Sequence, residues 1–183
     1  MKVFRDGDTF IAPRGSYFEG NVRINGDFIV PPDTHFWGHL VVDGNLELGP
    51  NSSIKYKLTC QNAVIGAKVR IGGDVNVEGS ITVCDNTTVK NITAGGNVII
   101  RPGVTVGDVK CGGTLYVFGK VKSGKLYGKQ VKILRDPYPR YYEEPEEEEG
   151  AQAQDVLPQN NPGYSNGEYE NEYAAEEEPQ NRY

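Results

Sequence analysis

Residues 20–48, GNVRINGDFIVPPDTHFWGHLVVDGNLEL, decide the fold of this chain. Apolar residues in this stretch come in pairs two positions apart, and the pairs return after 18 residues, so that Phe28 returns as Leu46. A spacing of two places both side chains on the same face of a β-strand. The stretch therefore predicts short strands, each with one apolar face, in a repeating unit of 18 residues.

The same repeat extends over the first three quarters of the chain, as an internal repeat must if it is to define a fold. Its steps shorten from 18 to 17 residues in three separate series, so each unit of 17–18 residues is expected to hold three short strands. The first series is Phe10, Phe28, Leu46, Val64, Ile81, Val98 and Leu115; the second is Val22, Leu40, Leu58, Val75, Ile92, Val109 and Leu126; the third is Phe36, Ile54, Ile71, Val89 and Val106.

Three kinds of corner separate the three strands. Glycine precedes the second series by two residues in five cases of seven, and it precedes the first series equally often, with Asp8 and Asn62 as the exceptions. Because Gly, Asp and Asn best tolerate a positive φ, we expect left-handed backbone at these two corners. The third corner carries Pro32, Pro50, Asp85 and Pro102. Three distinct corners predict a triangular coil.

These observations predict an all-β chain that forms a three-faced parallel β-helix over residues 1–135. Each strand would pair in parallel with its equivalent one turn later, at ~4.8 Å. About seven turns would give a rod roughly 35 Å long. No turn can bury its apolar residues alone, so the stack is stable only as a whole.

The remaining residues, 136–183, have a different composition. Residues 1–135 carry 17 Lys and Arg against 11 Asp and Glu, a net charge of +6, whereas residues 136–183 carry 2 against 14, a net charge of −12. Seven of the 11 tyrosines lie in this second part. Because it has few aliphatic residues to bury, we expect a disordered acidic tail. The tail would either dock other proteins or act as a solvating brush.

Several features bear on the compartment and the class of the protein. The charged start, Met-Lys-Val-Phe-Arg-Asp, does not resemble a secretory signal, and no apolar run approaches the ~20 residues that span a bilayer. The three cysteines suggest no disulfide framework. We therefore expect a cytoplasmic protein, with membrane association left open, that is not an enzyme and needs no cofactor, metal or small-molecule substrate.

The two ends of the predicted rod are the candidate functional surfaces. An uncovered end exposes unpaired backbone groups and the last layer of the core, and no polar cap or helix is evident at either end. We therefore expect each end to bind another copy of the chain, although the end residues could instead fold back as plugs. The expected polymerisation interface consists of Val3, Phe4, Phe10, Ile11, Leu126, Tyr127, Val131, Ile133 and Leu134.

The repeat also resembles a known family. A Gly-Asp or Gly-Asn pair before an aliphatic or aromatic residue, as in Gly26-Asp27-Phe28 and Gly96-Asn97-Val98, and the corner Arg101-Pro102-Gly103 are similar to the bactofilins over about residues 15–135. The resemblance implies a right-handed coil, polymerisation without nucleotide, and a scaffold role in cell shape or in positioning other proteins.

Two other functions fit parts of the sequence. The left-handed β-helix of hexapeptide-repeat acyltransferases has a strict period of 18 and needs a histidine base, for which His35 and His39 are the only candidates. Alternatively, the chain could be a monomeric module whose basic end binds a polyanion or, weakly, a membrane. The basic end consists of Lys120, Lys122, Lys125, Lys129, Lys132 and Arg135.

Overall fold

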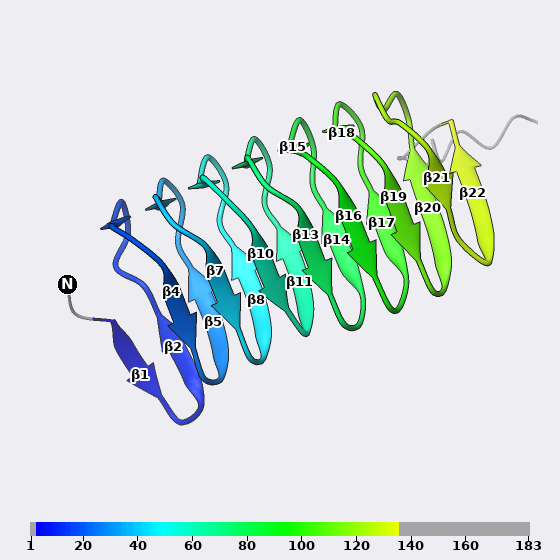
Figure 1. Ribbon diagram of the computed structural model, residues 1–183. Helices are drawn as coiled ribbons and strands as arrows, with labels where there is room; N and C mark the ends of the chain where they lie inside the picture. The colour runs from blue at the N-terminus through cyan, green and yellow to red at the C-terminus, as the bar shows by residue number, and fades with distance from the viewer. Residues whose placement is uncertain (1–2, 136–183) are drawn as a thin grey trace, which may run out of the picture. The chain divides into compact units, whose positions relative to one another are not determined.

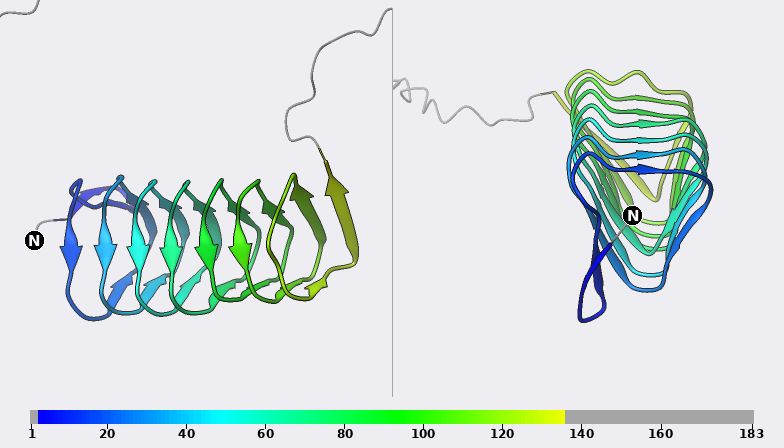
Figure 2. Two further views of the ribbon diagram at one scale, coloured as in Figure 1. Left: turned by 90° about the horizontal axis from the view of Figure 1, so that it is seen from above. Right: turned by 90° about the vertical axis from the view of Figure 1, so that its left-hand side faces the viewer.

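Short strands of two to five residues build the part of the chain that this computed structural model describes, residues 3–135. No described residue is helical. The strands form three sheets, which are the three sides of a stack of about seven coils (Figure 1). Seen from the N-terminal end, the chain turns clockwise as it recedes, so the coil is right-handed (Figure 2). This hand differs from the left-handed coil of the hexapeptide-repeat acyltransferases.

The nine-stranded sheet contains the first strand of the chain and the last. Its order along the stack is β1 (Phe4–Asp6), β2 (Thr9–Ile11), β5 (Asp27–Val30), β8 (Asn45–Leu48), β11 (Asn62–Ile65), β14 (Ile81–Val83), β17 (Val98–Ile100), β20 (Thr114–Phe118) and β22 (Gln130–Leu134).

Shorter strands form the other two sides. The seven-stranded sheet consists of β4 (Val22–Ile24), β7 (Leu40–Val42), β10 (Leu58–Cys60), β13 (Val75–Val77), β16 (Ile92–Ala94), β19 (Val109–Cys111) and β21 (Leu126–Tyr127). The six-stranded sheet consists of β3 (Tyr17–Phe18), β6 (His35–Phe36), β9 (Ser53–Ile54), β12 (Arg70–Ile71), β15 (Thr88–Val89) and β18 (Thr105–Val106).

The core fills the centre of the stack, where alternate residues of every strand point inward. Phe28, Leu40 and Val98 are completely buried, as period-two alternation requires. The second and third series of the sequence are confirmed in register: Leu40 pairs with Leu58 and Leu58 with Val75, while Phe36 pairs with Ile54. Similar side chains therefore lie above one another in columns that run along the stack.

The first series is wrong at one rung. Ala63, not Val64, pairs with Leu46 and with Ile81, and Val64 points outward with 49% of its surface exposed. The coil before this rung has 17 residues and the coil after it has 18, the reverse of the predicted order. Hydrophobicity alone could not place the rung, because the outward column of this sheet also contains Ile29 and Ile99.

The corner glycines are also explained differently from the prediction. Among those two positions before the first and second series, only Gly20 and Gly26 have a positive φ. The others lie where successive coils approach each other too closely for a side chain: a Cβ on Gly96 would be 2.9 Å from the carbonyl carbon of Gly79. Close stacking, not a left-handed backbone, selects glycine there.

Left-handed backbone occurs instead at the proline corner. One residue per coil has a φ between 57° and 77°, namely Gly15, Asp33, Asn51, Lys68, Asn86 and Gly103. The next residue is buried in each coil, and in four coils it carries a hydroxyl. Thr34 Oγ1 donates a hydrogen bond to the carbonyl of Pro31 (3.0 Å), and Thr87 Oγ1 donates to Gly66 (2.8 Å). These bonds satisfy polar groups that would be costly to bury unpaired.

Polar side chains connect successive coils at another corner. The Asn62 amide donates to Asn45 Oδ1 (2.9 Å), and Asn62 Oδ1 in turn accepts the backbone N–H of Ser80 (2.8 Å). Asp27 and Asn97 accept backbone N–H groups of the following coil in the same way. This corner ladder fixes the register of neighbouring coils independently of the core.

The first strand departs from the repeat. β1 pairs with β2 in an antiparallel hairpin, so the N-terminal edge of the nine-stranded sheet is a reversed strand. The sequence analysis did not predict this hairpin, because β1 is outside the 17–18-residue repeat. The turn uses Gly7, which has a φ of 58°.

Candidate functional site

The C-terminal end of the stack presents an uncovered layer of the core. Val131 pairs with Leu115 and Ile133 with Val117, so both continue inward columns of the nine-stranded sheet. Leu115 is completely buried, but Ile133 is 66% exposed because no described coil follows it. Leu126 continues the inward column of the seven-stranded sheet beyond Val109 and is half-buried. These three side chains form the end layer that the sequence predicted.

Two other predicted interface residues lie at the same end but on the outside. Tyr127 pairs with Lys110 and Leu134 pairs with Phe118, both in outward columns. Both side chains are more than two-fifths exposed. They would border a contact made by the end layer and would not lie at its centre.

The N-terminal end is partly covered. Phe10 begins the inward column that continues with Phe28, and it is half-buried. The Arg5 guanidinium carbon lies 5.2 Å from the centre of the Phe10 ring, a cation–π arrangement that places Arg5 over this layer. Val3 also packs against the core. The hairpin and Arg5 therefore shield apolar residues that the sequence analysis expected to be open.

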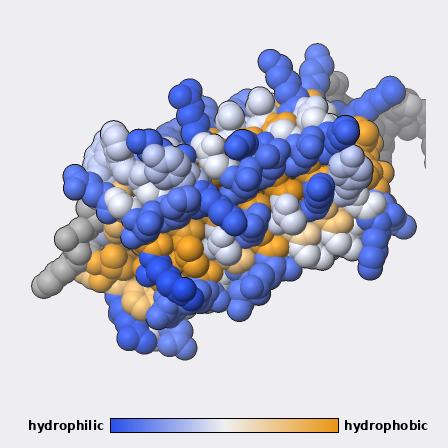
Figure 3. Space-filling view, viewed as in Figure 1, coloured by the Kyte–Doolittle hydropathy of each residue, from blue (hydrophilic) through white to orange (hydrophobic). Residues whose placement is uncertain are grey.

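Phe4 and Ile11 lie away from the end layer. They pair with each other across the hairpin, and Ile11 pairs with Ile29 of the outward column. Phe4 is 64% exposed. Apolar surface gathers at both ends of the stack on the face shown in Figure 3. Of the nine predicted residues, Phe10, Leu126, Val131 and Ile133 thus belong to the end layers proper.

The charges at the two ends differ. Six cations of the basic end lie among the last coils, and Lys132 Nζ is 5.5 Å from the ring centre of Tyr116. At the N-terminal end, Arg5 pairs with Asp8 (3.7 Å) and Arg14 with Asp33 (3.8 Å). All four side chains are largely exposed, so each pair contributes little stability. The basic end has no printed ion pair of this kind among the described residues.

The histidines and cysteines occupy structural positions. His35 Nδ1 lies 2.8 Å from Ser53 Oγ, and the His39 ring stacks on Tyr56 with centres 5.2 Å apart. Cys60 and Cys111 share an inward column three coils apart, as predicted. Burial raises the pKa of Cys60 to about 12. Burial also raises the pKa of Cys84, against the nearby Arg101 charge, which lowers it.

The described residues contain no cluster of three or more His, Cys, Asp and Glu side chains that could hold a metal ion. Nor does any helix suited to crossing a bilayer occur between residues 3 and 135. The expectations for the acidic tail, residues 136–183, lie outside the described residues.

One feature was missed by the sequence analysis. An open groove of about 530 Å³ lies on the six-stranded sheet, beside Tyr17, His35 and Trp37. The aromatic residues at the outward positions of two successive coils were a signal that could have located it.

Searches against protein-family models, curated proteins and solved structures found no match to this chain.

Proposed function

We propose that this chain is a structural subunit that assembles end to end into filaments without nucleotide and serves as a scaffold. The proposal is supported chiefly by the end layer at the C-terminal end, where Val131 and Ile133 continue columns that are fully buried one coil earlier. Another copy placed on this layer would remove apolar surface from water, and that burial is favourable without any chemical energy source.

The backbone supports the same contact. β22 is the last strand of the nine-stranded sheet, so one of its edges has no strand beside it among the described residues. An open strand edge is a template for pairing with another chain. A contact between unlike ends would not close and would generate a filament, and alternating contacts between like ends would also extend along one axis.

The scaffold role and the partners follow from the resemblance to the bactofilins and from the tail sequence. The copies of the chain are the first partners, and other proteins that bind residues 136–183 would be the second. The same proposal includes a cytoplasmic location and no enzymatic activity.

Electron microscopy and sedimentation of the purified chain test this function in buffer without nucleotide. We expect filaments from the wild type and none from Ile133→Arg, because a guanidinium in the end layer would have to be buried. Thr93→Arg is the matched control: it adds the same charge at an exposed position on β16, in the middle of the stack. A wild type that stays monomeric at micromolar concentration would refute the proposal, as would Ile133→Arg filaments.

A second candidate is the polyanion-binding module, favoured by the six cations of the basic end. Retention of the monomeric chain on heparin, lost at high salt, would support that function in the absence of filaments.

A further inference from the structure

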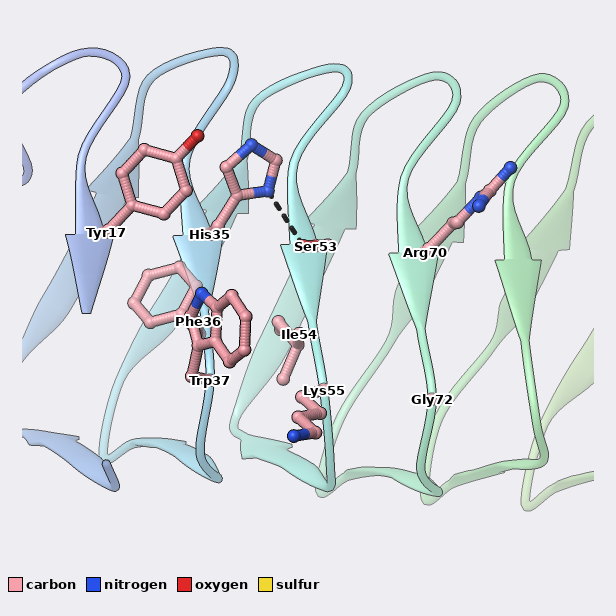
Figure 4. Close-up of a pocket in the computed structure, with 9 residues that line it drawn as sticks. All are labelled: Tyr17, His35, Phe36, Trp37, Ser53, Ile54, Lys55, Arg70 and Gly72. Carbon is pink, nitrogen blue, oxygen red and sulfur yellow. Dashed lines mark hydrogen bonds between the residues drawn. The ribbon is translucent and has the colours of Figure 1, made fainter. Parts of the chain in front are cut away.

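The six-stranded sheet carries its aromatic side chains together. Tyr17 on β3 and His35 on β6 occupy one outward column with ring centres 5.0 Å apart, and Trp37 follows His35 in the neighbouring column. The next coils have Ser53 and Gly72 at the equivalent outward positions. Small residues beside large rings leave the aromatic groove, an open hollow bounded by Tyr17, His35, Trp37, Lys55 and Arg70 (Figure 4).

The exposed rings have no role in the core. Phe36 and Ile54 point inward from the same strands and are almost completely buried, whereas Trp37 is 56% exposed and Tyr17 is 59% exposed. Exposed aromatic rings grouped on one surface are typical of binding sites, because they gain much from being covered by an apolar ligand.

The groove also has a fixed polarity. Figure 4 shows the rings at one end and Arg70 at the other, with no side chain at Gly72 between them. Lys55 Nζ lies 5.2 Å from the Trp37 ring centre, beside the hollow. The outward residues of the described strands from His35 to Thr105 include no Asp or Glu. A ligand that fits should therefore combine an apolar or ring-containing part with negative charge.

The hydrogen bond between His35 and Ser53 helps to hold this shape. His35 Nδ1 and Ser53 Oγ are 2.8 Å apart, so the imidazole is held between the Tyr17 ring and the next coil. The wall of the groove is thus ordered before a ligand arrives, which lowers the cost of binding.

Proline-containing peptides in the extended, left-handed conformation bind shallow grooves lined by aromatic rings. Carboxylates beside the prolines would reach Lys55 and Arg70 in charge-assisted hydrogen bonds. Residues 137–149 of this chain, PYPRYYEEPEEEE, are a sequence of this chemistry. A nucleic acid fits less well, because the 14 Asp and Glu residues at positions 136–183 would repel a polyphosphate.

We propose that the aromatic groove binds an extended peptide containing prolines, tyrosines and clustered carboxylates, supplied by another protein molecule. The rings would cover the prolines and tyrosines, and Arg70 and Lys55 would bind the carboxylates. The inference is independent of filament assembly, because the groove is on a side of the stack and not in an end layer.

Trp37 makes the test direct, because it is the only tryptophan in the chain. The probe is a synthetic peptide of residues 137–149, titrated into a full-length chain in which the six glutamates at positions 143–149 are replaced by Gln, so that the chain does not compete with the probe. Trp37 emission and calorimetry are recorded together, so that binding without a fluorescence change is also detected.

We expect saturable binding with a blue shift of Trp37 emission, weakened by salt. Arg70→Gln and Lys55→Gln should each weaken binding roughly tenfold. Lys110→Gln, the matched control on the seven-stranded sheet, should bind as the unsubstituted chain does. A probe with Gln in place of Glu should bind poorly. Absence of binding, equal effects of Arg70→Gln and Lys110→Gln, or tighter binding of single-stranded oligothymidylate than of the peptide would overturn the proposal.

Discussion

The interior coils and the end coils are built from the same columns but differ in what covers them. Leu115 is completely buried, whereas Ile133, two positions along the next strand of the same sheet, is two-thirds exposed. The repeat is the same in both places, and only the number of neighbouring coils differs. The stability of the stack should therefore come from its interior, and its binding capacity from its ends.

The two ends also differ from each other. At the N-terminal end a reversed strand and Arg5 lie over the first layer, and at the C-terminal end the last layer is open and is surrounded by lysines. The C-terminal end should therefore contribute more to assembly.

The largest effect is expected from a charge placed in an interior coil. Ile92→Asp should unfold the stack, because Ile92 is 1% exposed and a carboxylate there would be buried without a partner. Thr93→Asp, on the exposed side of the same strand, should leave it folded. Circular dichroism and urea unfolding compare the two. If Ile92→Asp folds normally, the interior does not carry the stability.

Shortening one column at two rungs compares the interior with the end directly. Leu115→Ala should lower the free energy of unfolding by about 2–5 kcal/mol, since it leaves a cavity in a packed layer. Ile133→Ala should lower it by less than about 0.5 kcal/mol at concentrations where the chain is monomeric. Urea unfolding followed by circular dichroism measures both. Equal losses would show that the last coil is as well covered as the interior ones.

The thiols at two rungs of another column extend this comparison to pH. Cys60 is buried, and its pKa is raised from about 9 to about 12, so only the unfolded chain releases the Cys60 proton between these values. Stability should therefore fall as the pH rises above 9, by roughly 1.4 kcal/mol per unit more than in Cys60→Val. Thermal or urea unfolding at pH 8 and pH 10 measures this difference, which should be absent at pH 8.

Native-state alkylation gives the matching kinetic result. Cys111, half-buried in the same column near the end, should react with a thiol reagent much faster than Cys60. Peptide mapping after short exposure would detect the labelled residue, and faster labelling of Cys60 would contradict the assigned column.

The smallest effect concerns the reversed strand. Gly7→Val should cost roughly 1 kcal/mol, because Gly7 has a φ of 58° that β-branched residues avoid. Nothing lies within 4 Å of a Cβ at this position, so the loss would come from the backbone alone. Gly7→Asn, which tolerates the same φ, should lose less. Urea unfolding of the two variants separates backbone strain from loss of the hairpin.

Most of the fold could be predicted from residue spacing, because each inward column must be apolar in every coil. The spacing failed at Val64 for a physical reason: the outward side of the nine-stranded sheet is also partly apolar. The corner ladder held the missing information, since Asn62 directly precedes Ala63 as Asn45 precedes Leu46. A register based on these polar residues would have placed the rung correctly.

The candidate site was predicted less completely. The end layer of Val131 and Ile133 follows from the repeat, because the columns simply stop. The cover that Arg5 gives to Phe10 does not, since it depends on a hairpin outside the repeat. The aromatic groove depends on the absence of side chains at Ser53 and Gly72 next to rings one coil earlier, which a search for apolar columns does not consider.

The corner ladder has a consequence for how such a chain can change length. Each rung, such as Asn62, binds only the coil before it and the coil after it. Duplicating or deleting one complete unit would therefore leave every remaining contact of the same kind intact, whereas gaining or losing a single residue would turn a strand inside out. Rods of this design can lengthen during evolution in whole increments of ~4.8 Å, with both end surfaces unaltered.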